Sequence, residues 1–325
     1  MAGFWSGKKV LVPGGAGFIS SHLAEQLAGM GAFVTVLDDL SSGRWSRLDG
    51  LAGAIQRIES DVTDPATRAD CFPGMDVVMN LAGLAPGLTL DEDRHQRLYE
   101  ENTRVATAVL DGVLAHRVPR LLVVSSSCVY PDDAPVPTPE ISLEGSEPEA
   151  VNHGYGLAKR AIEAEAMHAA RSHPWLSIAI ARPFNVYGAR DSRSWPGAHV
   201  IPSLLEKILS PDPEVVVWGS GNQTRSFIHA HDIARGLALV TELHAKAAPV
   251  NIGSSEEIRL CDLVNSLMEL SGVHKPVRFD TGKPEGATRK AADISKLRRI
   301  AGGFRPAISW QSGLRELVDA CLLNR

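Results

Sequence analysis

The chain has 325 residues, of which 44% are hydrophobic and 22% charged, and its formal net charge is -5. This size allows one large domain or a large domain with a smaller lobe. The acidic balance excludes a basic field for nucleic acid and a polybasic patch for a membrane surface. The four cysteines lack metal-type spacing and no apolar run reaches membrane-spanning length, so we expect a cytoplasmic protein without a bound metal.

Short apolar runs alternate with amphipathic stretches along the first half. We predict strands at 9–12, 33–37, 54–59, 76–81, 120–125 and 176–181, and helices at 18–30, at 99–117 and from Tyr155 onward. Near-continuous apolar strands separated by helices are typical of a parallel sheet that is covered on both faces. The predicted fold class is therefore α/β, a doubly wound Rossmann sheet with a smaller mixed α/β C-terminal lobe.

After residue 185 the character of the sequence changes. We predict a polar loop at 188–197, a helix at 201–209 and a strand at 215–218. We assign residues 1–185 to the Rossmann domain and residues 186–325 to the substrate lobe, with partial interleaving of the two.

A glycine-rich turn, Gly14-Gly15-Ala16-Gly17-Phe18-Ile19-Ser20, joins the first predicted strand to the first helix. Glycines permit a tight turn and close backbone approach to a pyrophosphate, which then lies at the positive helix N-terminus. Asp38, about 20 residues on at the end of the second strand, completes a dinucleotide site. A carboxylate there accepts hydrogen bonds from both ribose hydroxyls and repels a 2′-phosphate. Asp39 strengthens the repulsion, so we predict NAD rather than NADP, with Arg44 as the one nearby cation that favours NADP.

Tyr155 and Lys159 are four residues apart in a predicted helix and share one face. A lysine ammonium beside a phenol favours the phenolate, so we expect Tyr155 to exchange a proton near neutral pH. A strand that ends at Ser125-Ser126-Ser127 precedes this helix. Together with the dinucleotide turn, these residues predict hydride transfer to or from an alcohol or ketone.

With these motifs the chain resembles the extended short-chain dehydrogenase/reductase family, in particular its nucleotide-sugar epimerases and dehydratases. The segments Asn80-Leu81-Ala82-Gly83, Arg182 to Gly188 and Trp218 to Arg225 extend the resemblance nearly end to end, although Ser20 replaces the last glycine of the family's turn. The residues that the resemblance assigns to NAD are Gly14, Gly17, Phe18, Ile19, Asp38, Asp39, Ser41, Asp61, Val62, Leu81, Ala82, Gly83, Asn102, Ser125, Tyr155 and Lys159.

The resemblance also assigns catalytic roles. Ser126 would hydrogen-bond the sugar oxygen that becomes a ketone, Tyr155 would take that oxygen's proton while NAD takes hydride, and Lys159 would hold the nicotinamide ribose. The two positions after Ser126 are typically acidic in the dehydratases of this family. Here they are Ser127 and Cys128, which disfavours water elimination.

The cysteine directs the prediction toward proton transfer at carbon. The segment Ser126-Ser127-Cys128-Val129-Tyr130-Pro131 resembles the motif of GDP-mannose 3,5-epimerases and GDP-fucose synthases. In those enzymes the cysteine moves a proton on the carbon beside a ketone. A modest pKa shift would make the Cys128 thiol a usable base near neutrality. His199 occupies the position at which those enzymes carry a histidine or lysine partner, and histidine can donate or accept a proton at cellular pH.

The predicted function is an NAD-dependent epimerase that oxidises C4 of a nucleotide sugar, inverts C3 and/or C5 through Cys128 and His199, and reduces the ketone again. Three alternatives remain open: an epimerase-reductase resembling GDP-fucose synthase, a simple C4 epimerase, and a dinucleotide-binding regulator without activity. The resemblance implies a GDP-hexose substrate and a homodimer. It assigns substrate contacts to Ser127, Asn185, Val200, Lys207, Trp218, Arg225, Lys283 and Arg289.

Overall fold

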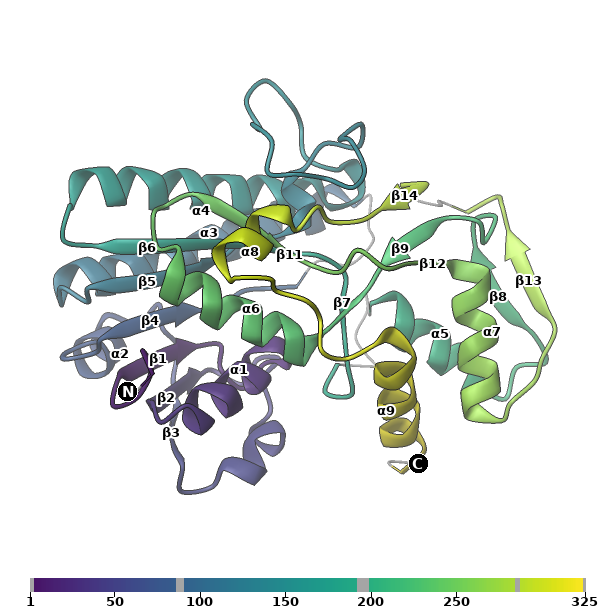
Figure 1. The fold of residues 1–325 in the computed structure, drawn as a ribbon, viewed down its shortest axis with the longest axis horizontal. Helices are drawn as coiled ribbons and strands as arrows, with labels where there is room; N and C mark the ends of the chain where they lie inside the picture. Colours follow the sequence, from purple (N-terminus) through teal and green to yellow (C-terminus); the bar gives the residue numbers. More distant parts are fainter. Residues whose placement is uncertain (1–2, 86–90, 192–198, 284–286, 324–325) are drawn as a thin grey trace.

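The computed structural model describes residues 3–85, 91–191, 199–283 and 287–323. Its centre is a parallel seven-stranded sheet with the order β11-β6-β5-β4-β1-β2-β3 (Figure 1). The strands are β1 Lys9–Pro13, β2 Phe33–Asp38, β3 Ile55–Glu59, β4 Val77–Asn80, β5 Arg120–Val124, β6 Ser177–Pro183 and β11 Pro249–Ile252. The strand order reverses between β1 and β4, and in doubly wound sheets ligands bind outside the carboxyl ends at such a point. The predicted Rossmann fold class is confirmed.

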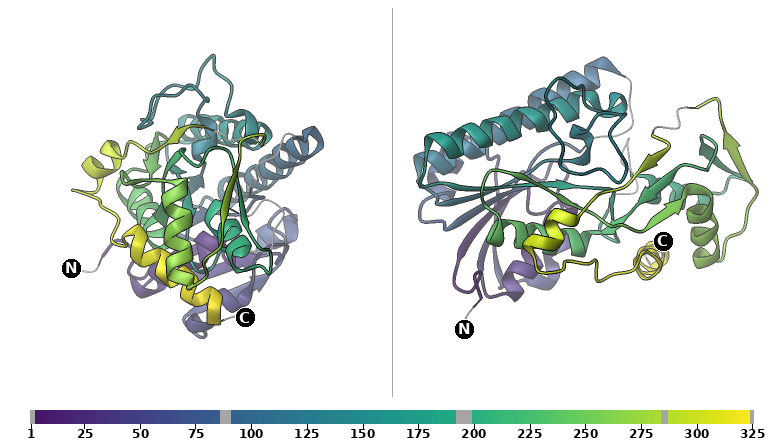
Figure 2. Two further views of the ribbon diagram at one scale, coloured as in Figure 1. Left: turned by 90° about the vertical axis from the view of Figure 1, so that its right-hand side faces the viewer. Right: turned by 45° about the horizontal axis from the view of Figure 1, so that its top comes forward.

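Helices cover both faces of the sheet because its central strands are apolar on both sides. Val10 and Val12 of β1 pack into one buried cluster, whereas Leu11 between them packs into another. Helices α1, α6 and α8 contribute to the first cluster and α2, α3 and α4 to the second, which gives three layers (Figures 1 and 2). Their bounds are α1 Phe18–Gly29, α2 Pro65–Cys71, α3 Glu92–Ala115, α4 His153–Ser172, α6 Ala230–Leu243 and α8 Ser295–Ile300.

Helix α3 begins seven residues before the predicted start at Tyr99. Asp91 caps it, because its side chain accepts a hydrogen bond from the backbone N–H of Asp93 at 3.2 Å. The first two turns are almost wholly charged or polar, so apolar periodicity does not reveal them. His95 and Leu98 are nevertheless buried, which places this polar end of α3 against the rest of the fold.

The smaller lobe has a separate core, to which residues such as Leu205, Leu263 and Leu317 contribute. It contains three small sheets and three helices among the described residues. These are β7 Val186–Tyr187 with β10 Ile228–His229, β8 Val215–Trp218 with β13 Val277–Asp280, β9 Thr224–Ser226 between β12 Glu257–Arg259 and β14 Arg289–Lys290, and α5 Val200–Leu209, α7 Leu260–Ser271 and α9 Trp310–Leu323. Residues 192–198 of the predicted polar loop lie outside the described part of the chain.

The chain passes between the sheet and the lobe more than once. β11 forms the edge of the seven-stranded sheet beside β6, and α6 packs beside α1, although both elements follow lobe strands in sequence (Figure 1). Residues after 186 are therefore divided between the two regions.

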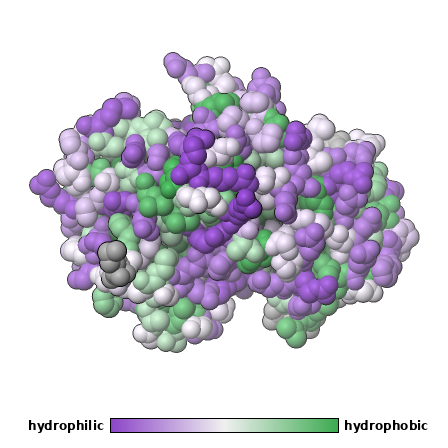
Figure 3. Space-filling view, viewed as in Figure 1, coloured by the Kyte–Doolittle hydropathy of each residue, from purple (hydrophilic) through white to green (hydrophobic). Residues whose placement is uncertain are grey.

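The surface shows no concentration of apolar side chains on the face drawn in Figure 3, where hydrophilic and hydrophobic residues are interspersed. In the described ranges, no helix has both the length and the apolar composition that a bilayer crossing requires.

Candidate active site

The glycine turn lies between β1 and α1, at the carboxyl edge of the sheet. Gly14 has a φ of 71°, and a Cβ at this position would lie 2.6 Å from the backbone of Ala82. Gly17 is the N-cap of α1, and no side chain caps this helix within the described residues. Its first N–H groups therefore remain available to an anion. Ser20 does not disturb the turn: its buried hydroxyl donates to the Gly14 carbonyl at 2.5 Å and braces it.

Asp38 ends β2 and faces this turn. The backbone N–H groups of Ala16 and Leu40 each donate to its carboxylate at 2.9 Å. Burial raises the pKa of the carboxyl, and the two N–H donors oppose that shift. The cation that braces the turn is Arg47, which the sequence analysis did not single out. Its guanidinium donates to the Ala16 carbonyl at 3.0 Å, and its charge acts on Asp38.

The remaining predicted NAD residues lie along the carboxyl ends of the neighbouring strands. Gly83 has a φ of 147°, and the Asn102 side chain fills the space that a Cβ would occupy. Among the described residues, Asn102 Oδ1 and Ser125 Oγ are buried without a hydrogen-bond partner. Buried polar atoms rarely lack partners in native proteins, and a bound dinucleotide can supply them. Asp39 and Asp61 are exposed and accept hydrogen bonds from the following loop residues. These residues fit NAD.

An Asp38→Asn variant tests the cofactor assignment. A hydrogen bond to a charged acceptor is worth about 1.5–3 kcal/mol, so we expect the Kd for NAD to rise about tenfold or more and the preference over NADP to fall. Titration with both cofactors measures the change. Asp39→Asn, at an exposed position, is the matched control with a smaller expected effect. An unchanged preference in Asp38→Asn would contradict the assignment.

The structure brings four of the five predicted catalytic residues together. Ser126 caps the short 3₁₀ helix η2 (Ser127–Val129), because its hydroxyl accepts the Cys128 N–H at 3.2 Å. Tyr155 on α4 lies near Ser126, whose side chain lowers the pKa of the phenol. Lys159 Nζ lies 5.3 Å from the Tyr155 ring centroid and donates to the Val124 carbonyl at 3.0 Å.

The protonation states differ from those expected from the sequence. Burial, and next the charge of Cys128, raise the pKa of the Tyr155 phenol well above its usual value, and the Ser126 hydrogen bond only partly opposes them. Burial likewise lowers the pKa of Lys159 to about 8. For Cys128, burial followed by the charge of Glu149 raises the pKa to about 12. Burial therefore favours the protonated form of both the phenol and the thiol.

Two charged residues that the sequence analysis missed complete this cluster. Glu149 is buried and its charge raises the pKa of the Cys128 thiol, and Lys290 Nζ lies 2.5 Å from the Glu149 carboxylate. Glu149 precedes Tyr155 by six residues in an irregular segment, whereas Lys290 is 141 residues from Glu149 along the chain. No local pattern joins them. The sequence indicates these two residues only weakly: Glu149 is an acidic residue shortly before Tyr155, and Lys290 is a basic residue directly after Arg289.

His199 lies elsewhere. It is the N-cap of α5, its Nδ1 lies 2.8 Å from Asp191 Oδ2, and its ring centroid is 6.5 Å from that of Phe18 in the glycine turn. The His199 side chain is 45% exposed; desolvation lowers its pKa, but the hydrogen bond and charge of Asp191 raise it further, so the net shift is upward. No hydrogen bond joins His199 to Cys128 in the described residues.

Two cations flank an exposed aromatic ring on the lobe. Trp218 is 44% exposed, and the Nζ atoms of Lys207 and Lys283 lie 6.0 and 5.9 Å from its ring centroid. An exposed aromatic face with nearby positive charge suits a base and its phosphates. Lys207 also donates to the Val216 carbonyl at 2.9 Å.

The other predicted substrate residues have varied surroundings. Asn185 Nδ2 donates to the Ser226 carbonyl at 3.0 Å, and Arg225 acts electrostatically on Lys290 beside the catalytic cluster. Arg289 is occupied by an ion pair with Glu257 at 2.6 Å. Ser127 is buried in η2, and Val200 packs against the core of the lobe.

A model of the NAD-dependent epimerase/dehydratase family matches residues 10–253. The chain belongs to this family. GDP-L-fucose synthase 1 of Arabidopsis thaliana is 33% identical over 227 residues, which is 69% of each chain. In the solved structures, the epimerase Mth375 of Methanothermobacter thermautotrophicus superposes with a TM-score of 0.88 at 26% identity and covers 98% of this chain and 94% of its own. A UDP-glucose 4-epimerase of Thermotoga maritima with UDP-glucose superposes with a TM-score of 0.85 at 25% identity, and the match covers 97% of this chain and 99% of the epimerase.

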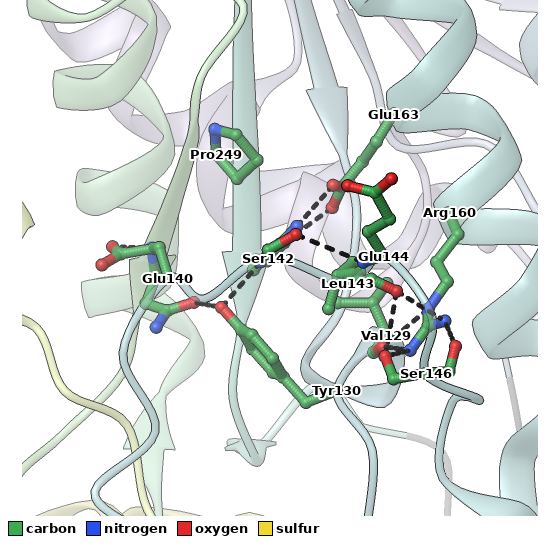
Figure 4. A network of polar contacts seen from close by, with 12 residues as sticks. Val129, Tyr130, Glu140, Ser142, Leu143, Glu144, Ser146, Arg160, Glu163 and Pro249 are labelled. Atoms are coloured by element: carbon green, nitrogen blue, oxygen red, sulfur yellow. Dashed lines mark hydrogen bonds and ion pairs between the residues drawn. The ribbon is translucent and has the colours of Figure 1, made fainter. Parts of the chain in front are cut away.

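The cofactor of this epimerase/dehydratase is NAD, which agrees with the prediction from Asp38 at the end of β2. Polar contacts of Val129 and Tyr130, the two residues after Cys128, hold this segment in place (Figure 4). Arg160 of α4 donates to the Val129 carbonyl at 2.8 and 2.6 Å and also holds the loop at Ser146. Tyr130, the next residue, donates to Asn251 of β11 at 2.6 Å and accepts from Arg182 of β6 at 2.9 Å. The sheet and α4 thus fix η2 from two directions.

Proposed function

We propose that this protein is an NAD-dependent nucleotide-sugar epimerase that oxidises C4 transiently and inverts C3 and/or C5, with a GDP-hexose as substrate. The observation that carries the proposal is the Cys128 thiol beside the Ser126–Tyr155 pair, within a family of NAD-dependent epimerases and dehydratases. The similarity to a GDP-L-fucose synthase supports the guanine nucleotide.

Ser126 and Tyr155 act on one oxygen of the sugar. Ser126 acts on the pKa of the Tyr155 phenol, so the two hydroxyls lie near each other, and we assign both to the C4 oxygen, with Tyr155 moving its proton and Ser126 orienting it. Bound NAD supplies the hydride acceptor and donor, and its oxidised ring carries the positive charge that favours the phenolate. Lys159 holds the nicotinamide ribose. Its pKa of about 8 means that this cation is lost as the pH rises above that value.

Cys128 and His199 act on carbon. A ketone at C4 acidifies the hydrogens on C3 and C5, and inversion requires one group that removes a proton and another that returns it on the opposite face. Asp191 raises the pKa of His199, which favours its protonated form, so His199 suits the donor role. Cys128 is protonated in the resting site and needs a nearby acceptor before it can act as a base.

Substrate binding is assigned to the lobe. The Trp218 ring with Lys207 and Lys283 would hold the nucleotide end, and Arg225 beside Lys290 would approach the sugar diphosphate. We further propose that two copies associate through α3 and α4, which light scattering of the purified protein tests.

A second candidate is an epimerase-reductase that resembles GDP-fucose synthase and consumes NADPH. The 33% identity to such an enzyme favours it, and the protonated phenol of Tyr155 suits donation to an existing ketone. Asp38 opposes it, because a carboxylate repels the 2′-phosphate of NADPH. A simple C4 epimerase would leave Cys128 without a task, and a regulator would not need the Ser126–Tyr155–Lys159 unit. Cofactor that co-purifies, identified by mass spectrometry, separates the two leading candidates.

The proton-transfer claim predicts solvent deuterium at C3 or C5 of the sugar nucleotide, observed by mass spectrometry or NMR. Removing a general acid or base costs about 10²–10⁴-fold, so Cys128→Ser and His199→Ala should each slow incorporation by that factor. Hydride transfer should persist in both variants. Cys321→Ser, at a buried cysteine of the lobe core, is the control that should exchange at the parent rate. Exchange at the parent rate in both active-site variants would refute the assignment.

A further inference from the structure

The helix that carries Tyr155 begins without a cap from its own N-cap residue. Helix α4 starts at His153, and the side chain of the N-cap residue Asn152 accepts no hydrogen bond from the first turn. The Asn152 amide instead donates to Oε1 of Glu149. The first N–H groups of a helix have no partners within it, so the start of α4 depends on acceptors from elsewhere in the protein.

His95 of α3 supplies one of these acceptors. Its Nδ1 accepts the backbone N–H of Gly154, the residue before Tyr155, at 3.3 Å, although the two residues are 59 apart in the chain. His95 is 5% exposed, and its ring lies edge to face with that of His153 at a centroid distance of 6.3 Å. An imidazole nitrogen accepts a hydrogen bond only when it carries no proton. The form of His95 that caps α4 is therefore the neutral ring with its proton on Nε2.

Two close backbone contacts hold the same turn of α4. A Cβ at Gly154 would overlap the carbonyl oxygen of His95, and a Cβ at Gly156 would overlap the carbonyl oxygen of Cys128. The backbone directly before Tyr155 therefore touches α3, and the backbone directly after it touches η2. Helices α3 and α4 continue side by side beyond these contacts (Figure 2). The position of the Tyr155 backbone thus depends on the first turn of α4 and on its two neighbours.

We propose that His95 is a positioning residue for Tyr155, because its hydrogen bond to Gly154 caps α4 and so sets where the phenol lies beside Ser126. Gly154 and Tyr155 are consecutive, so a change in the first turn of the helix moves the phenol directly. A displacement of about 1 Å in a reacting group can slow a reaction about 10²-fold. His95 would thus control the rate of hydride transfer through the helix start. This inference rests on the proposed function.

The first test needs no substrate and compares His95→Asn with His95→Leu. Asparagine and leucine have nearly the same shape, but asparagine can place an oxygen where Nδ1 lies, whereas leucine can place only a methyl group there. In His95→Leu the Gly154 amide should exchange with solvent about fivefold faster or more, because loss of a cap weakens the first turn of a helix. In His95→Asn the exchange rate should stay within about twofold of the parent, because a cap remains. NMR measures both rates, and an unchanged rate in His95→Leu would overturn the proposal.

The second test is the rate constant for NADH formation in a single turnover of the sugar nucleotide. It should fall about tenfold or more in His95→Leu and stay within about threefold of the parent in His95→Asn, because only the former misplaces the phenol. Partial unfolding would lower the amplitude of the signal without changing its rate constant, which separates positioning from stability. His168→Leu is the control, because His168 is exposed farther along α4 and contacts Arg171. Equal rate constants in the leucine and asparagine variants of His95 would refute the positioning role.

The ring nitrogens of His95 in the parent protein provide a test that does not depend on the folding of any variant. Their nitrogen NMR shifts at mildly alkaline pH should show an unprotonated Nδ1 and a protonated Nε2. A proton on Nδ1 would overturn the proposal. If the parent transfers no hydride from any candidate sugar nucleotide, the proposed function fails, whereas the Gly154 amide and the His95 ring still decide whether His95 caps α4.

Discussion

Tyr155→Phe should lower turnover of the sugar nucleotide by about 10²–10⁴-fold, the range for loss of a positioned general acid or base. The ring stays in place, so its packing on α4 and the nearby Lys159 Nζ remain, and only the hydroxyl near Ser126 is lost. NAD binding should change little. Stopped-flow measurement of the transient NADH absorbance in a single turnover reports the hydride step directly.

The control for this prediction is Tyr187→Phe, which removes a buried hydroxyl that bonds only backbone carbonyls near the start of α9 among its described contacts. Its turnover should stay within about a factor of three of the parent, because a neutral hydrogen bond contributes about 1 kcal/mol to stability and this one touches no catalytic group. Undiminished turnover in Tyr155→Phe would eliminate the hydride-transfer mechanism.

Arg182→Leu should lower the free energy of unfolding by about 3–5 kcal/mol, the usual cost of leaving one partner of a buried ion pair alone. The Arg182 and Glu163 side chains are each 3% exposed and joined by two hydrogen bonds of 2.8 and 2.6 Å. Arg182 also donates to the Tyr130 hydroxyl, so the loss would loosen the end of the catalytic strand. Urea unfolding followed by circular dichroism measures the change.

Two further variants separate charge burial from packing. Glu163→Leu combined with Arg182→Leu should recover most of the lost stability, because no unpaired charge remains inside. Arg278→Leu breaks an exposed pair with Glu214 and should change stability by less than about 1 kcal/mol. If the double variant is no more stable than Arg182→Leu, the buried charge is not the cause.

The parallel sheet and the dinucleotide turn were predictable from sequence because their determinants are local. Continuous apolar strands, a glycine turn and an acid at the end of β2 all lie within a few dozen residues, and β8 has the predicted bounds of 215–218. The start of α3 was missed because a capped helix end that is charged carries no apolar period.

The electrostatics of the site were not predictable in the same way. Spacing placed Tyr155 and Lys159 on one face, but only the fold shows that burial dominates the pKa of the phenol and of the Cys128 thiol. Glu149 and Lys290 meet across the sheet–lobe junction, and a contact between such distant residues depends on the complete topology. Sequence patterns thus locate reactive groups better than they assign protonation states.

The return of the chain to the sheet at β11 limits how this protein can be divided. β11 pairs with β6 from Ile180 to Pro183 and covers what would otherwise be an exposed edge of apolar, parallel strands. An exposed edge of that kind is a template for pairing with other chains. A fragment cut at residue 185 would therefore aggregate rather than persist as a free NAD-binding unit, and a split reporter needs its junction elsewhere than between β6 and β11.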